Sequence, residues 1–246
     1  MRENYTLTRL FIRWPLTQSA PIALSKEQAH YLGTVLRKST GDSLRVFNGA
    51  SGEWRAEIIE LSRKGGKISL TEQFRAPKSA PDIWLCFAPV RKHRTAFIIE
   101  KGTELGASEF HPLITEHTQF PRLNTVKARL QAIEAAEQTE RLDVPKVHEV
   151  ARLQEVLSAW DESRLLIFAD EAGEAKPALD VLNDIPQTPA AILIGPEGGF
   201  SHPEREMLRA KRFVTPVSLG PRILRADTAA LSLLTLWQAV RGDWGY

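Results

Sequence analysis

The chain has 246 residues, a net charge of +2 and 43% hydrophobic residues, the composition of an ordinary globular protein of one large or two modest domains. No apolar run reaches the roughly 20 residues of a membrane span, and residues 1–5 lack the apolar core of a secretion signal, so we expect a cytoplasmic protein. The single cysteine, Cys86, rules out an internal disulfide and lies in an apolar run, where we expect a core residue rather than a nucleophile.

The first 74 residues predict a small β-barrel. Short alternating segments separated by turn residues predict strands at 8–14, 43–47, 53–60 and 68–70. Ser25, with Gln28 three residues later, predicts a capped helix over 25–37. This segment carries 11 Lys and Arg against 7 Asp and Glu, which favours a polyanionic partner. The candidate contacts to the phosphates of such a partner are Arg9, Arg13, Arg37, Lys38, Arg63, Lys64 and Lys67.

A linker and then a different pattern follow. Residues 75–82 have the proline and small-residue content of an inter-domain linker. From residue 83 to 246, apolar strands alternate with helices, which predicts an α/β domain with a mainly parallel sheet. We expect strands at 83–90, 109–115, 164–169, 190–194 and 214–219, and helices at 94–106, 125–141, 154–160, 178–182, 201–212 and 228–241.

Two of these helices carry further expectations. Helix 125–141 places Val126, Leu130, Ile133 and Ala136 on one face, so we expect that face to be buried. Helix 228–241 is apolar almost all round, which assigns it either to the core or to a subunit interface.

Two glycine-containing loops follow the last two predicted strands. Residues 195–199 read Gly-Pro-Glu-Gly-Gly, and residues 219–228 also contain a Gly-Pro step. In a parallel sheet, ligands bind at the carboxyl ends of strands, where both loops lie. After the first loop, Ser201 and Glu204 predict a capping box at the start of a helix.

Other kinds of site do not fit these residues. The loops match neither a P-loop nor the dinucleotide-binding glycine spacing, and the sequence contains no Gly-x-Ser-x-Gly nucleophile elbow. The six histidines show no paired ligand spacing, and there is one cysteine, so we expect no metal.

Four segments in chain order indicate a family. They read IEKGTELGASEFHPLITEHT, EAAEQTERLDVPKV, LIGPEGGFSHPERE and VSLGPRILRADTAALSLLTLWQ. In these segments the chain resembles the bacterial ribosomal RNA uridine-N3 methyltransferases (the RsmE family) of the SPOUT superfamily. The basic first segment matches the family's PUA-like RNA-binding domain, so the resemblance covers nearly the whole chain. It implies a PUA-like β-barrel over 1–74, followed by a SPOUT-type α/β domain with a parallel sheet and a C-terminal trefoil knot over 83–246.

The resemblance also implies S-adenosylmethionine as the cofactor, held by knot loops near 168–171, 195–199 and 219–228. Glycines leave backbone amides and carbonyls accessible to adenine, and apolar side chains form the pocket walls. The expected cofactor-binding residues are Ile194, Gly195, Pro196, Glu197, Gly198, Gly199, Leu219, Gly220, Ile223, Leu224, Arg225, Ala226 and Thr228.

Methyl transfer to N3 of uracil requires positioning, a proton acceptor and stabilisation of the charge that develops on the base. Arg225 is the first candidate for stabilising charge, with Gln138 and Arg141 as neighbours from the long helix. Asp227 is a candidate proton acceptor, but it is also well placed to be the N-cap of the last helix. The family usually has Glu at this position, which weakens the case for a base.

The implied partners are small-subunit (16S) ribosomal RNA, within the assembled subunit, and a second copy in a homodimer. No membrane partner is implied. Two alternatives stay open: a non-catalytic RNA-binding or ribosome assembly factor with the same fold, and a methyltransferase acting on transfer RNA. Both glycine loops are intact, which favours an enzyme over the non-catalytic alternative.

Overall fold

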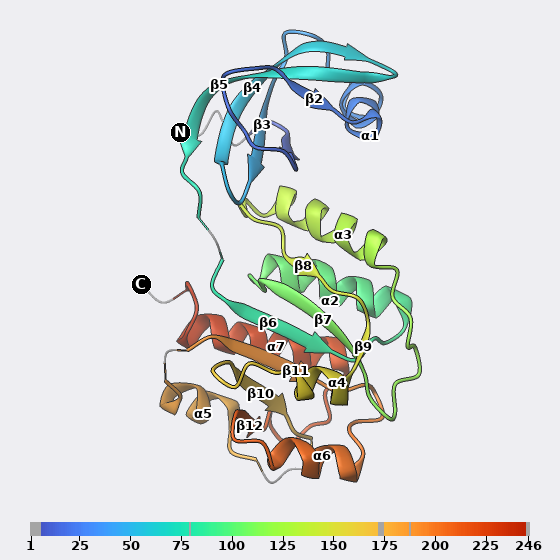
Figure 1. The fold of residues 1–246 in the computed structure, drawn as a ribbon, viewed down its shortest axis with the longest axis vertical. Coiled ribbons are helices and arrows are strands. Elements are labelled where there is room, and N and C mark those ends of the chain that lie inside the picture. The colour runs from blue at the N-terminus through green and yellow to red at the C-terminus, as the bar shows by residue number, and fades with distance from the viewer. Residues whose placement is uncertain (1–5, 79, 172–174, 187, 245–246) are drawn as a thin grey trace. The chain divides into compact units, whose positions relative to one another are not determined.

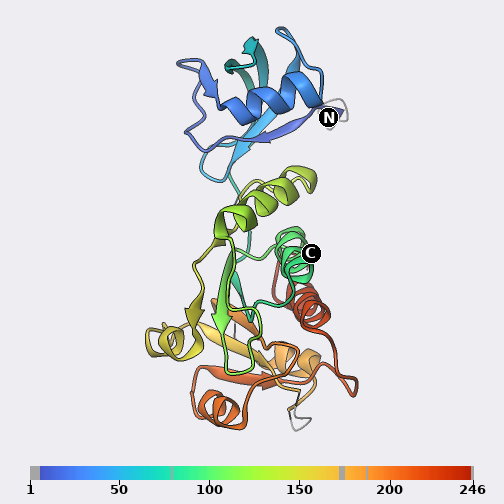
Figure 2. The ribbon, with the colours of Figure 1, turned by 90° about the vertical axis from the view of Figure 1, so that its right-hand side faces the viewer.

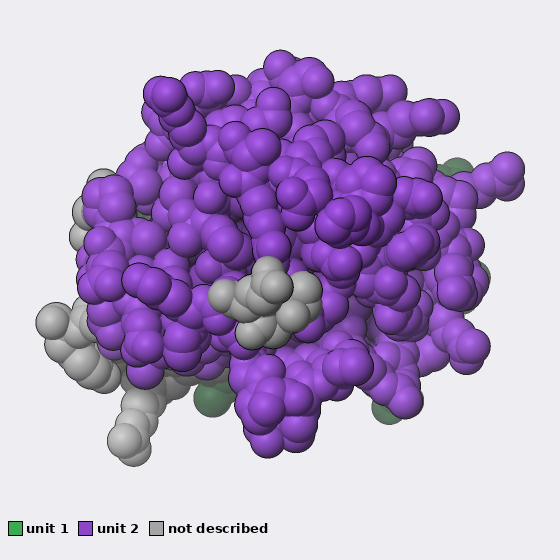
Figure 3. All heavy atoms as spheres, turned by 90° about the horizontal axis from the view of Figure 1, so that it is seen from below, with its two compact units in different colours: residues 1–79, 136–144 green, residues 80–135, 145–246 purple. Residues whose placement is uncertain are grey.

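The computed structural model describes residues 6–78, 80–171, 175–186 and 188–244, which form two compact units (Figure 1; Figure 3). The first unit is Met1–Ser79 with Ala136–Val144, and the second is Ala80–Ala135 with Pro145–Tyr246. Residues 136–144 thus belong to the first unit, whereas the sequence suggested one boundary at 75–82. The helix α3 (Thr125–Gln138) contributes residues to both units.

The first unit is built on a curled, open five-stranded sheet in the order β1-β3-β4-β5-β2. Its strands are β1 (Arg9–Phe11), β2 (Ile22–Leu24), β3 (Ser43–Asn48), β4 (Gly52–Ser62) and β5 (Gly65–Arg75). Strand β1 pairs with β3 in parallel, and the other pairs are antiparallel. Leu32, Leu44, Ile58 and Ile68 are fully buried in the core of this half-barrel.

The helix predicted over 25–37 is α1 (Lys26–His30), continued by the π-helical turn η2 (Tyr31–Val35). The predicted capping box is confirmed, because the Ser25 hydroxyl accepts the Gln28 amide at 3.2 Å and the Gln28 side chain accepts the Ser25 amide at 2.9 Å. The chain then passes through Arg37, which has a φ of +56°.

Arg9 fastens residues 136–144 to the sheet of the first unit. Its side chain is buried, its Nε donates to the Glu53 carboxylate at 2.6 Å, and its Nη1 donates to the Ala136 carbonyl at 2.7 Å. Arg45 joins the cluster by donating to Glu140 at 2.7 Å. Arg9 was predicted to contact RNA. This prediction is corrected, because the guanidinium is occupied and shielded from solvent.

The second unit is a parallel sheet with helices on both faces, as the alternating pattern predicted. The strand order is β12-β10-β11-β6-β7-β8, with β9 also paired to β7. The strands are β6 (Ile83–Phe87), β7 (Glu109–Ile114), β8 (Lys146–Val147), β9 (Ala151–Arg152), β10 (Leu165–Ala169), β11 (Ala190–Ile194) and β12 (Val214–Val217). The helices are α2 (Lys92–Glu104), α4 (Leu153–Ser158), α5 (Ala178–Asp184), α6 (His202–Arg209) and α7 (Ala226–Val240). Helices α2, α5 and α7 cover one face, and α4 and α6 cover the other (Figure 2).

The predicted buried face of α3 is wrong. Val126 is 72% exposed and Leu130 is 60% exposed, whereas Ala128 and Ala132 are buried. Helix α3 therefore packs through small alanine side chains, which permit a close approach, and its larger apolar residues face outward. Of the expected face, Ala136 is buried and Ile133 is half-buried.

The remaining core predictions hold. Leu233, Leu234 and Trp237 of α7 are buried in the second unit. Cys86 has no exposed surface, and burial raises the pKa of its thiol, so it is a core residue, as expected. None of the described helices combines the length and the apolar composition that crossing a bilayer requires.

The chain crosses the sheet twice near its C-terminal end. From β11 it passes through α6 on one face to β12 at the sheet edge, and from β12 it returns to α7, which packs against α2, α5 and β11 on the other face. These crossings bring residues 169–171, 195–199 and 217–226 together at the carboxyl ends of β10, β11 and β12.

Candidate functional site

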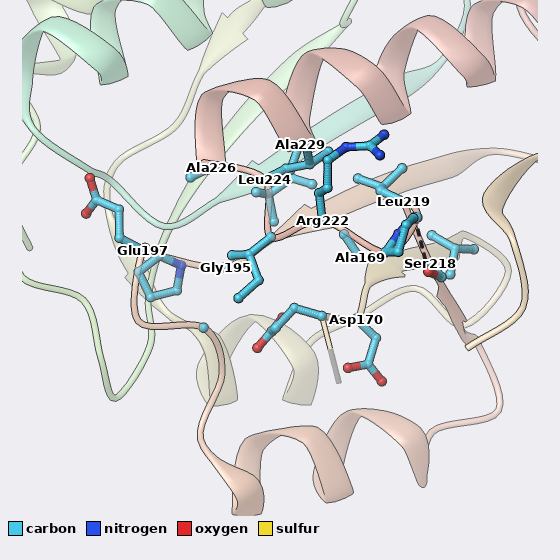
Figure 4. Close-up of a pocket in the computed structure, with 18 residues that line it drawn as sticks. Ala169, Asp170, Gly195, Glu197, Ser218, Leu219, Arg222, Leu224, Ala226 and Ala229 are labelled. Carbon is cyan, nitrogen blue, oxygen red and sulfur yellow. Dashed lines mark hydrogen bonds between the residues drawn. The ribbon is translucent and has the colours of Figure 1, made fainter. Parts of the chain in front are cut away.

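A cavity lies where these three loops meet (Figure 4), and its volume, including the open solvent at its mouth, is about 840 Å³. Ten of the predicted cofactor-binding residues line it: Ile194, Gly195, Pro196, Glu197, Gly199, Leu219, Gly220, Ile223, Leu224 and Ala226. Gly198, Arg225 and Thr228, which the structure also describes, lie outside the lining. Figure 4 shows Ala169, Leu224, Ala226 and Ala229 around the cavity, while the Glu197 side chain points outward.

The first loop needs glycine at two positions. The Gly199 amide donates to the Pro196 carbonyl at 2.9 Å, which closes a tight turn, and Gly199 has a φ of +67° that other residues rarely adopt. A Cβ at Gly199 would also collide with the Glu171 carboxylate. At Gly195, a Cβ would lie 2.7 Å from the Phe200 ring. Backbone atoms therefore form this wall of the cavity.

Two carboxylates, Asp170 and Glu171, follow β10 and line the cavity. The Asp170 side chain is fully buried and accepts from Arg209 at 2.6 Å and 3.1 Å. Glu171 accepts the Phe200 amide at 3.2 Å. The resemblance placed a knot loop at 168–171, but neither carboxylate was named as a site residue. An acidic pair directly after a buried strand was the available signal.

His117, in the loop after β7, contacts the glycine loop from outside the cavity lining. Its Nδ1 lies 3.0 Å from the Gly198 carbonyl and 3.2 Å from the Gly199 carbonyl. Because a carbonyl oxygen can only accept, Nδ1 carries the proton in this contact. The sequence did not predict this role, because His117 is 81 residues from Gly198 in the chain.

The start of α7 differs from the prediction. The helix begins at Ala226 with Arg225 as its N-cap residue, so the interpretation of Asp227 as the N-cap was wrong. Asp227 accepts the Thr228 amide at 3.0 Å, and its carboxylate lies 3.6 Å from the Arg94 guanidinium. Arg225 is exposed.

The other two predicted catalytic residues, Gln138 and Arg141, belong to the first unit, whereas the cavity is in the second. Gln138 is exposed, and Arg141 donates from its Nε to Asp143 at 2.8 Å. Their catalytic role stays a prediction.

The remaining basic residues proposed for RNA lie on the first unit. Arg13, Arg37, Arg63, Lys64 and Lys67 are exposed and Lys38 is half-buried. Lys67 donates to Glu60 at 2.7 Å. Their contact with RNA also stays a prediction.

A second cluster of ionisable groups, Glu109, His111 and His148, lies beside Trp84. Their ligand-type atoms come within 4.8 Å of one another, a grouping that histidine spacing along the chain did not reveal because the residues come from β7 and the end of β8. The two imidazoles stack 3.9 Å apart at 19°. Both Nε2 atoms contact the same Glu109 oxygen, at 3.1 Å and 2.5 Å.

Comparison with known proteins identifies the family. A family model described as an RNA methyltransferase domain matches residues 77–238, and one described as an RNA methyltransferase PUA domain matches residues 24–71. A protein of Rickettsia conorii named ribosomal RNA small subunit methyltransferase E is 32% identical over 92% of this chain and 93% of its own length. The chain belongs to the ribosomal RNA small subunit methyltransferase E family. The resemblance to the RsmE family is thereby confirmed.

Further RsmE-like proteins agree with this placement. A relative of the same name from Synechocystis sp. is 36% identical, with 85% of this chain and 70% of the relative covered. A solved structure of a putative methyltransferase from Legionella pneumophila has 30% identity and a TM-score of 0.86, covering 96% of this chain and 99% of that one. That structure is described as a complex with the bound cofactor SAM. The predicted fold, a SPOUT-type domain after a PUA-like one, is confirmed.

Proposed function

We propose that this protein is an S-adenosylmethionine-dependent methyltransferase that modifies N3 of a uridine in small-subunit ribosomal RNA. The observation that carries the proposal is the three-loop cavity, which lies within the matched RNA methyltransferase domain. Its two glycine-containing loops are intact, and the Legionella relative of similar fold is described with SAM bound.

The residues of the cavity suit this cofactor. Ile194 and Leu224 provide apolar walls for adenine, and the peptide groups of residues 195–199 provide donors and acceptors for its edge. The Glu171 carboxylate, whose side chain is 37% exposed, complements a positively charged ligand. S-adenosylmethionine supplies an electrophilic methyl group when bound.

For the chemical step we propose that Arg225 stabilises the negative charge that develops on the uracil oxygens. Its exposure, and its place between Leu224 and Ala226 of the cavity lining, leave it available to a bound base. Asp227 is the proposed proton acceptor on the same helix turn. Gln138 and Arg141 are proposed to assist in gripping the base.

We also propose a cytoplasmic homodimer. Ile223 is 92% exposed beside the cavity, and Leu179 of α5 is 48% exposed, so apolar surface is available in the second unit near α7 for a second copy.

The function is tested by incubating purified protein and radiolabelled S-adenosylmethionine with small ribosomal subunits that lack base methylation. Digestion of the RNA and chromatography of nucleosides should yield labelled N3-methyluridine. Transfer RNA serves as the parallel substrate. Label in transfer RNA alone would overturn the proposed substrate, and cofactor binding without transfer to either RNA would support the non-catalytic alternative.

A further inference from the structure

A run of positive charge lies at the start of α2. Residues 91–94 read Arg-Lys-His-Arg, the first turn of the helix contains no acidic residue, and Arg91, Lys92 and His93 are exposed. Arg225, at the start of α7, is exposed as well. Within the described residues, no hydrogen bond or ion pair holds the side chain of Arg91, Lys92 or Arg225. We call Arg91 and Lys92 the cationic rim.

The topology places the rim beside the cavity. Strand β6 pairs in parallel with β11, with Phe87 opposite Ile194, and the Ala88 amide donates to the Ile194 carbonyl at 3.0 Å. The chain that leads into α2 therefore leaves the sheet next to the glycine loop. At the other end of the run, the Arg94 guanidinium lies 3.6 Å from Asp227. That contact joins the start of α2 to the start of α7, where Ala226 lines the cavity.

This charge has no structural use in the helix. The amino end of a helix carries partial positive charge, so basic side chains there are unfavourable for α2 itself. Arg94 is partly compensated by Asp227, whereas Arg91 and Lys92 face solvent without an acidic partner in the described chain. Local arrangements that oppose stability are expected where function uses them. A polyanion would relieve the repulsion.

We propose that the cationic rim binds the RNA phosphates that flank the target uridine. This inference rests on the proposed function. N3 of uracil lies on the edge used for base pairing, so the target must be unpaired when it reaches the cavity, and sequence-specific proteins commonly read such splayed-out bases. The RNA chain on either side of the target base then passes over the cavity mouth, where the positively charged side chains of the rim contact the RNA phosphates. RNA contact is thus assigned to the catalytic unit, in addition to the basic residues predicted on the first unit.

The test compares the wild-type protein with the double variant R91Q/K92Q. The control is K211Q/R212Q, an adjacent basic pair just before β12 and hence at the opposite, amino end of the strands. Binding to transcribed small-subunit ribosomal RNA is measured over a series of salt concentrations, without cofactor. Loss of two phosphate contacts should reduce the slope of log K against log salt by about 1.4 and weaken binding roughly tenfold at moderate salt.

Two further measurements separate RNA binding from cofactor binding and from the methyl-transfer step. Affinity for S-adenosylmethionine and the rate of methyl transfer at saturating RNA should stay within about twofold of wild type, because the rim acts on phosphates flanking the target. A wild-type slope in R91Q/K92Q, or an equal change in K211Q/R212Q, would overturn the inference. If the wild-type protein transfers no methyl group, the proposed function fails, while the salt slopes still decide whether the rim binds RNA.

Discussion

The Asp170 carboxylate and the Arg209 guanidinium form an ion pair behind the cavity, with Nη2 2.6 Å from the carboxylate. Asp170 has no exposed side-chain surface, whereas the Arg209 side chain is 29% exposed. The pair joins the residue that follows β10 to the last turn of α6 and so anchors the cavity loop after β10.

Substituting Asp170→Asn should destabilise the protein, because it leaves the Arg209 charge without its partner. Because the Arg209 side chain stays 29% exposed, the cost is that of a lost hydrogen bond between charged groups, about 2 kcal/mol. Urea unfolding should therefore show a lower midpoint, and cofactor affinity should fall as the loop loses its anchor. Asp184→Asn, at the exposed end of α5, is the control. Equal urea midpoints for the two variants would show that the ion pair of Asp170 with Arg209 contributes nothing to the stability of the folded protein.

Substituting Gly199→Ala should close the glycine loop to the cofactor. The added Cβ meets the Glu171 carboxylate, and the positive φ adds a strain of about 1 kcal/mol. Gly41→Ala is a matched control, because Gly41 has a φ of +94° but no atoms within 4 Å of its Cβ position. We expect similar backbone strain in both variants and a loss of S-adenosylmethionine affinity, measured by calorimetry, in Gly199→Ala alone.

Substituting Arg225→Ala should slow methyl transfer by about a hundredfold, the effect of removing one stabilising donor of developing charge, while cofactor affinity is retained. Arg222→Ala is the comparison, since Arg222 lies in the same loop and its side chain extends away from the cavity (Figure 4). Single-turnover rates of methyl transfer distinguish the two variants. An unchanged rate in Arg225→Ala would exclude the role proposed for this residue.

The free energy of unfolding should decrease as the pH falls below 6.5, because His111 stays unprotonated in the folded protein. Burial and the neighbouring His148 lower the pKa of His111 to about 4 from its ordinary 6.5. Between these values the unfolded chain binds the proton and the folded protein does not, so unfolding becomes easier as pH falls from 6.5 to 4 and levels off below. His111→Phe, which keeps a ring next to Trp84, should show a shallower decline in thermal midpoint over that range. A parallel decline would contradict this assignment.

Local chemistry in the sequence predicted most of the second unit. Apolar runs predicted β6, β7, β10, β11 and β12, whereas the two-residue strands β8 and β9 were not predicted. The capping box at Ser201 predicted the start of α6, where the Ser201 hydroxyl accepts the Glu204 amide at 3.4 Å. The glycine loops were predicted from their position after strands. The family resemblance, rather than periodicity, supplied the cofactor and the knot.

The errors come from long-range packing. Val126 and Leu130 follow helical spacing, yet alanines on another face of α3 are the ones that are buried. Arg9 looked like a surface cation, because nothing in its surroundings along the chain reveals that it donates to the Ala136 carbonyl, 127 residues away. The pairing of His148 with Glu109 likewise depends on the neighbouring strands β7 and β8.

The discontinuous first unit has a consequence for synthesis of the protein. Its sheet ends at Arg75, but Ala136 and Leu142 pack with Phe47 in its core, and Glu140 pairs with Arg45. Domains usually fold in order as they leave the ribosome. Here the amino-terminal unit stays incomplete until Val144 has been translated, so its final closure follows the emergence of β6, α2 and β7, and the two halves of the molecule mature together.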